Sequence, residues 1–199
     1  MISDLKIYHL ILSISAFAVS FIVTNTSLGV VKKISNRLGL LDYPNSRKLH
    51  SEPIARLGGV SIFLGFYCSV FVLDLLVKNF FIFNLNDYLF QLILLPLSLF
   101  FLLGLCDDIF KLSPVTRLIF QLSISSFAWM NGLRIENIDI SFFDIGIQNI
   151  TLPSYLSLFL TIIWLSGITN AVNWLDGLDG LASSFSSITL FNFGIFCFL

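Results

Sequence analysis

Long apolar stretches recur along the whole 199-residue chain and limit its fold more than any other feature. Most are long enough to cross the roughly 30 Å hydrocarbon core of a bilayer as a helix. Only 12% of the residues are charged, about half the share that is usual in soluble domains. The sequence therefore predicts an all-α, polytopic membrane helix bundle with about six transmembrane helices. These are expected at residues 7–31, 58–77, 88–105, 117–131, 153–170 and 182–199. Because 117–131 is short, five spans are the alternative.

The basic residues are distributed unevenly and predict the topology. Six of the 11 Lys and Arg residues lie between the first two spans, namely Lys32, Lys33, Arg37, Arg47, Lys48 and Arg56. By the positive-inside rule this connection and the one at 106–116 are cytoplasmic, and the N-terminus is outside. We expect one membrane domain over residues 1–199, with the first span retained. The alternating polar and apolar residues that begin at Leu133 predict a short external β-hairpin near 133–150.

Two groups of polar residues fall in connections of the predicted cytoplasmic side. Asp107 and Asp108 follow the third span directly. After the fifth span, polar residues recur every three positions, at Asn170, Asn173, Asp176 and Asp179. This spacing keeps side chains near one face of a helix. Carboxylate and amide oxygens are hard ligands, which suit Mg²⁺ or Mn²⁺.

The basic first connection adds a second kind of group to the same side. Arg47, Lys48 and Arg56 suit phosphate oxygens, and Arg can bind them with two parallel hydrogen bonds. Divalent cations and basic groups together are what transfer of a phosphoryl group requires. A plainer interpretation remains open for each part. Basic residues here are also needed for topology alone, and an isolated Asp pair at a helix end is usually structural.

Five motifs resemble a known family in order and spacing, over essentially the whole chain. They are Asp42-x-Pro44, Arg47-Lys-Leu-His50, Arg56-Leu-Gly-Gly59, Gly104-x-x-Asp-Asp108 and Asn170-Ala-Val-Asn-Trp-Leu-Asp-Gly-Leu-Asp-Gly-Leu-Ala182. The family is that of the polyprenyl-phosphate N-acetylhexosamine-1-phosphate transferases, in glycosyltransferase family 4. The second and third motifs are similar to the branch that primes O-antigen, enterobacterial common antigen or teichoic acid. One departure is Ala55, where the family usually has proline.

The resemblance implies a Mg²⁺-dependent reaction at the cytoplasmic face of the bacterial inner membrane. Undecaprenyl phosphate attacks the β-phosphorus of a UDP-N-acetylhexosamine, which gives a lipid-linked diphospho-sugar and UMP. Asp107 and Asp108 match the essential aspartates of the family, and with Asn173 and Asp176 they form the expected metal site. The expected substrate-binding residues are Arg47, Lys48, His50, Arg56, Asn170 and Asp179. The expected partners are the two substrates and the bilayer, without nucleic acid, and a homodimer is left open.

Two alternatives to this interpretation stay open. Members of the family are much longer, and their later loops supply a further aspartate and a His- or Arg-rich segment. We therefore expect this chain to be the amino-terminal part of a longer fold, and a truncated, inactive protein is one alternative. The other is a fragment of a transporter with a carboxylate relay, although such sites usually lie near the bilayer midplane.

Overall fold

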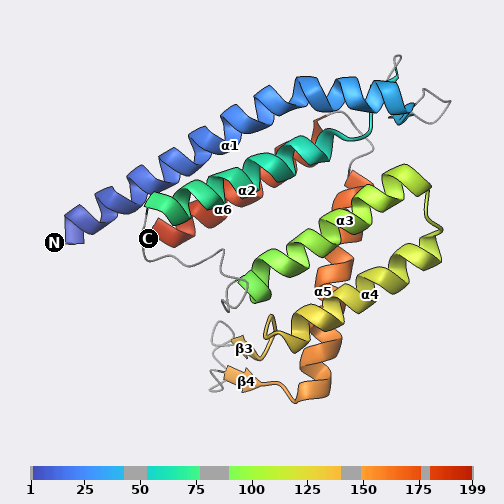
Figure 1. The fold of residues 1–199 in the computed structure, drawn as a ribbon. Coiled ribbons are helices and arrows are strands. Elements are labelled where there is room, and N and C mark those ends of the chain that lie inside the picture. The colour runs from blue at the N-terminus through green and yellow to red at the C-terminus, as the bar shows by residue number, and fades with distance from the viewer. Residues whose placement is uncertain (1, 43–52, 77–89, 140–148, 176–179, 199) are drawn as a thin grey trace. The chain divides into compact units, whose positions relative to one another are not determined.

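The computed structural model describes residues 2–42, 53–76, 90–139, 149–175 and 180–198. Six α-helices account for most of these residues, and two short antiparallel strand pairs lie in their connections (Figure 1). The all-α prediction is therefore confirmed. In chain order the elements are α1 (Ile2–Leu38), β1 (Leu41–Asp42), β2 (Ile54–Ala55), α2 (Gly58–Leu76), the π-helical turn η1 (Phe90–Leu94), α3 (Leu95–Phe110), α4 (Pro114–Met130), β3 (Asn137–Asp139), β4 (Asn149–Thr151), α5 (Ser154–Leu175) and α6 (Leu181–Phe198).

Four helical segments of the described residues are long and apolar enough to cross a membrane. They are Ile7–Leu38, Gly58–Leu76, Gln91–Phe110 and Ser154–Leu175. Each overlaps a predicted span, but α1, α3 and α5 continue past the predicted ends at 31, 105 and 170 to Leu38, Phe110 and Leu175. The predicted spans 117–131 and 182–199 correspond to α4, which has 17 residues, and to α6, which is apolar but shorter over Leu181–Phe196. The count of six spans and the orientation in the membrane stay predictions.

The first helix is longer than its apolar stretch. The sequence places the end of the first span at residue 31, whereas α1 continues to Leu38. Lys32, Lys33 and Arg37 therefore lie on a helix instead of in an irregular connection. The helix ends only where Gly39 adopts a positive φ of 68°, a conformation that glycine adopts without steric cost.

The chain divides into two units, Met1–Asn84 with Leu175–Leu199, and Leu85–Trp174. A single membrane domain over residues 1–199 stays a prediction, and the two units are described separately. In the first unit, α1 and α2 pack as an antiparallel hairpin (Figure 1). Gly65 lies at their contact, where an added Cβ would meet Thr24 Oγ1 and, at 2.7 Å, the carbonyl oxygen of Ser20. The two helices approach closely because this position has no side chain.

A short strand pair closes the end of the α1–α2 hairpin. Leu41 pairs with Ala55 and Asp42 with Ile54 in antiparallel register. The Ser35 hydroxyl donates to the Leu40 carbonyl oxygen at 2.6 Å, which ties the end of α1 to the first strand. This pair encloses the part of the predicted basic connection that contains Arg47 and Lys48, and residues 43–52 there lie outside the described residues.

In the second unit, a tight turn at 111–113 joins α3 to α4. Lys111 adopts a left-handed conformation with φ 52°, and its N–H donates to the Asp107 carbonyl oxygen at 2.8 Å. Ser113 then caps α4, because its hydroxyl accepts the N–H of Thr116 at 3.1 Å. Pro114 begins the first turn of α4, where proline is well tolerated. The turn therefore brings the start of α4 back beside the end of α3.

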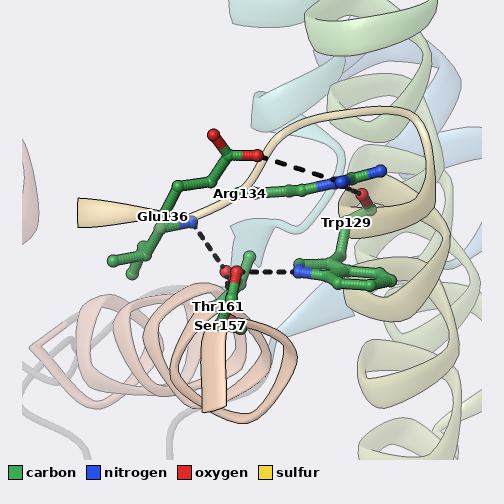
Figure 2. A network of polar contacts seen from close by, with 6 residues as sticks. Trp129, Arg134, Glu136, Ser157 and Thr161 are labelled. Carbon is green, nitrogen blue, oxygen red and sulfur yellow. Dashed lines mark hydrogen bonds and ion pairs between the residues drawn. The ribbon is translucent and has the colours of Figure 1, made fainter. Parts of the chain in front are cut away.

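The strands β3 and β4 pair in antiparallel register, so the predicted hairpin near 133–150 is confirmed. Figure 2 shows how its base is attached to α4 and α5. The indole of Trp129 donates to Ser157 Oγ at 3.0 Å, and the N–H of Ile135 donates to Thr161 Oγ1 at 3.0 Å. Arg134 lies over the Trp129 ring, 4.6 Å from its centre, and donates to the Trp129 carbonyl oxygen. These contacts fix one end of the α4–α5 pair.

Candidate active site

The predicted catalytic pair lies in the last turn of α3. Asp107 and Asp108 are both half-buried there, three and two residues before the helix ends at Phe110. Carboxylates at this position are unfavourable, because the C-terminus of a helix already carries partial negative charge. From the sequence, the positive charge expected beside them is a bound Mg²⁺ or Mn²⁺. The structure shows that the protein itself supplies a positive charge.

Arg117 on α4 forms an ion pair with Asp107. Its Nη1 lies 3.0 Å from Asp107 Oδ2, and the two side chains are 28% and 24% exposed. The turn at 111–113 makes this contact by returning the first turn of α4 to the end of α3. Arg117 is not among the site residues predicted from the sequence. The Ser113-Pro114 helix start between the two residues was the signal that a hairpin would join them.

The polar residues that recur every three positions begin on α5, and the two amides among them, Asn170 and Asn173, form the amide row. Asn170 and Asn173 lie in the last two turns of the helix, which ends at Leu175. Asn173 is exposed, whereas Asn170 is half-buried and its side chain is hydrogen-bonded. Gln121 of α4 donates to Asn170 Oδ1 at 3.3 Å and accepts from Asn170 Nδ2 at 2.8 Å. Asp176 and Asp179, which continue the three-residue spacing, lie outside the described residues.

The basic motifs are described only in part. Arg56 lies in the first unit and forms an ion pair with Asp42 at 2.8 Å. This contact joins two of the motifs that carry the family resemblance, Asp42-x-Pro44 and Arg56-Leu-Gly-Gly59. Arg47, Lys48 and His50 lie outside the described residues. Their expected contact with phosphate stays a prediction.

The donors that are described fit a hard divalent cation in kind. Two neighbouring carboxylates and an exposed amide provide oxygen ligands, the type that Mg²⁺ and Mn²⁺ prefer. Among the residues that the structure describes, no three His, Cys, Asp or Glu side chains are grouped so that they could hold a metal ion. The predicted set of Asp107, Asp108, Asn173 and Asp176 includes one residue outside that part of the chain, so this metal site stays a prediction.

Comparison with known proteins agrees with the resemblance seen in the sequence motifs. The family model described as "Glycosyl transferase family 4" matches residues 90–199. A probable undecaprenyl-phosphate N-acetylglucosaminyl 1-phosphate transferase of Bacillus subtilis is 30% identical over 179 residues, 88% of this chain and 45% of the relative. An undecaprenyl-phosphate alpha-N-acetylglucosaminyl 1-phosphate transferase of Thermotoga maritima is 33% identical over 168 residues, 84% of this chain and 46% of the relative. The protein of that name in Escherichia coli K12 is 27% identical over 187 residues, which are 93% of this chain and 47% of the relative.

No solved structure gave a match. The chain spans less than half the length of these relatives. With four helices of membrane-spanning length and bacterial relatives of this kind, it is a multi-pass bacterial membrane protein. The family model covers more than half of the chain, and it includes both the Asp pair of α3 and the amide row of α5. The resemblance seen in the motifs is thus confirmed, and the chain belongs to glycosyl transferase family 4.

Proposed function

We propose that the protein transfers N-acetylhexosamine-1-phosphate from a UDP-sugar to undecaprenyl phosphate and releases UMP. The donor that we expect is UDP-N-acetylglucosamine, and the product would begin synthesis of a cell-surface glycan. The active site would face the cytoplasm from the inner membrane, with the N-terminus outside. One observation carries the proposal: the half-buried Asp107 at the end of a membrane-length helix, held by Arg117. The printed names of the relatives support the reaction type, and family membership favours it over the transporter alternative.

The chemistry requires positive charge around two anionic substrates. An oxygen of the lipid phosphate attacks the β-phosphorus of the UDP-sugar, and the bond from that phosphorus to the oxygen shared with the α-phosphate breaks. UMP leaves with that oxygen. Asp107, Asp108, Asn173 and Asp176 would hold Mg²⁺ or Mn²⁺, which when bound neutralises charge on the diphosphate. The remaining groups expected at the substrates are Arg47, Lys48, His50, Arg56 and Asp179.

Transfer of labelled GlcNAc-1-phosphate to undecaprenyl phosphate tests this function directly. The assay uses membranes of cells that express the protein from its own gene, with UDP-GlcNAc as donor. We expect Asp107→Asn to lower the rate about 100-fold or more, by analogy with removal of one electrostatic stabiliser. Glu136→Gln is the matched control, because Glu136 is an exposed carboxylate near the hairpin. A chelator should stop the transfer, and Mg²⁺ or Mn²⁺ should restore it.

Each result of this assay decides a separate point. Without lipid-linked product from the unaltered protein, the transferase proposal fails and the inactive alternative stands. If the protein is active and Asp107→Asn matches Glu136→Gln in rate, the assignment of Asp107 is wrong. Activity that persists in the chelator overturns the metal requirement alone.

A further inference from the structure

The helix α4 had no functional role in the sequence-based expectations, yet it contacts both polar motifs of its unit. Arg117 and Gln121 are four residues apart and so lie on one face of α4. Arg117 contacts Asp107 of α3, and Gln121 contacts Asn170 of α5. The rise between the two residues along the helix is about 6 Å. One short segment of α4 therefore touches the ends of the two helices that carry the candidate site.

The contact between Gln121 and Asn170 is reciprocal and partly buried. Each amide donates to the other, and Asn170 Nδ2 also donates to the Ser166 carbonyl oxygen in its own helix at 2.8 Å. Gln121 is only 3% exposed. A buried amide that loses its partner is strongly disfavoured, so the pair permits one rotation of α5 relative to α4 and disfavours others.

The rotation of α5 also determines where the next amide of the row points. Asn173 lies three residues after Asn170 and is exposed. Fixing the direction of Asn170 toward α4 fixes the direction in which Asn173 leaves the helix. At the other contact, Arg117 holds one oxygen of the Asp107 carboxylate and so sets the orientation of that side chain.

We propose that Arg117 and Gln121 are positioning residues, which orient Asp107 and, through Asn170, the amide row of α5 for the reaction. Asn170 then acts through its contact with α4 and not by direct contact with substrate. This inference rests on the proposed function for its kinetic consequence. Its geometric consequence, the direction of Asn173, does not depend on activity.

A second hydrogen bond between side chains of α4 and α5 supplies a matched control. One turn further along α4, Ser125 and Ser166 form a buried hydroxyl pair at 3.2 Å. This pair joins the same two helices. Its two hydroxyls hydrogen-bond to each other, and its contact with a motif is made by the Ser166 carbonyl oxygen, which Ser125→Ala leaves in place. If the contacts serve packing alone, loss of the Ser125 hydroxyl and loss of the Gln121 amide should act alike on each folded molecule.

The kinetic test compares Arg117→Lys, Arg117→Met, Gln121→Ala and Ser125→Ala in membranes, with each rate divided by the amount of folded protein. We expect Gln121→Ala and Arg117→Met to lower kcat about tenfold with little change in KM for the UDP-sugar. Arg117→Lys should restore part of the loss, and Ser125→Ala should stay within about twofold. The exchanged pair Gln121→Asn with Asn170→Gln should be more active than either single variant, since contacting residues are not additive. Equal kcat for the Gln121 and Ser125 variants would overturn the proposal.

A second measurement needs no activity. Asn173→Cys is placed in a protein whose three native cysteines are changed to alanine, and its rate of modification by a maleimide is measured in membranes. Adding Gln121→Ala should change this rate severalfold, whereas adding Ser125→Ala should leave it unchanged. An unchanged rate with Gln121→Ala contradicts the positioning role. If the unaltered protein proves inactive in the transfer assay, the proposed function fails while this labelling result still decides the geometry.

Discussion

The α1–α2 pair and the α4–α5 pair are held together by different kinds of interaction. The interface between the two helices of each pair is called a seam. Both seams join apolar helices, and both bury small or polar residues. In α2 the buried residues are Ser61, Gly65 and Ser69, and the Ser69 hydroxyl donates within its own helix, to the Phe66 carbonyl oxygen. Between α4 and α5, by contrast, side chains hydrogen-bond across the seam.

This difference indicates what each seam specifies. Without a hydrophobic driving force in lipid, helices associate through close packing and interhelical hydrogen bonds. At Gly65 the α1–α2 seam depends on close approach, which is sensitive to side-chain volume. The α4–α5 seam relies on matched donors and acceptors, which are sensitive to chemistry. The seam that bears the candidate site has directional contacts, as expected where the rotation of a helix must be fixed.

The largest effect that separates the two seams is expected at Gly65. Gly65→Leu must displace Thr24 and the backbone of Ser20, so it should destabilise the protein by about 3 kcal/mol, at the upper end of typical overpacking. Thermal unfolding of the purified protein in detergent measures this. Gly29→Leu on α1 is the control, because a Cβ there meets nothing within 4 Å. Equal stability of the two variants would contradict a volume-limited seam.

A smaller effect is expected from removing an amide at nearly constant volume. Gln121→Leu leaves the Asn170 amide facing an apolar side chain, which should cost about 1–2 kcal/mol of stability. The double variant with Asn170→Leu removes both partners and should recover part of this loss. The same unfolding assay measures both. If the double variant is the less stable by the sum of the two single losses, the amides do not act as a pair.

Much of this architecture could be predicted from the sequence. The apolar stretches predict the membrane-length helices, and the alternation from Leu133 predicts the β3–β4 hairpin, because both patterns repeat with the period of the element. The motifs also place Asp107 and Asn170 at helix ends. These predictions depend on residues that are close in sequence.

The contacts between helices could not be predicted in the same way. The Gln121–Asn170 pair joins residues 49 positions apart, and an apolar stretch interrupted by one Gln does not reveal which helix it faces. The ion pair between Asp107 and Arg117 was likewise not predicted, because it depends on the angle of the turn at 111–113. Where α1 ends was misjudged since the apolar stretch stops before the helix does.

A still smaller effect on stability is expected at the end of the α4–α5 seam that lies beside the β3–β4 hairpin. Trp129→Phe keeps an aromatic ring beneath Arg134 but removes the hydrogen bond to Ser157, so it should cost about 1 kcal/mol. Trp164→Phe is the control on α5, since Trp164 is exposed. Transfer activity per folded molecule should stay unchanged, in contrast to the Gln121 variants. A large loss of activity would show that this end of the seam also positions the site.

The smallest effect distinguishes two serines of the first unit that are both 0% exposed. The Ser35 hydroxyl donates to the Leu40 carbonyl oxygen, whereas Ser61 Oγ is buried with no hydrogen-bond partner among the described residues. Ser35→Ala should therefore cost about 1 kcal/mol, and Ser61→Ala should be neutral or stabilise the protein by up to about 1 kcal/mol, because it removes a desolvated hydroxyl. Unfolding of the two variants side by side gives the comparison. If Ser61→Ala were destabilising to the same degree as Ser35→Ala, Ser61 would have a hydrogen-bond partner in the α1–α2 seam.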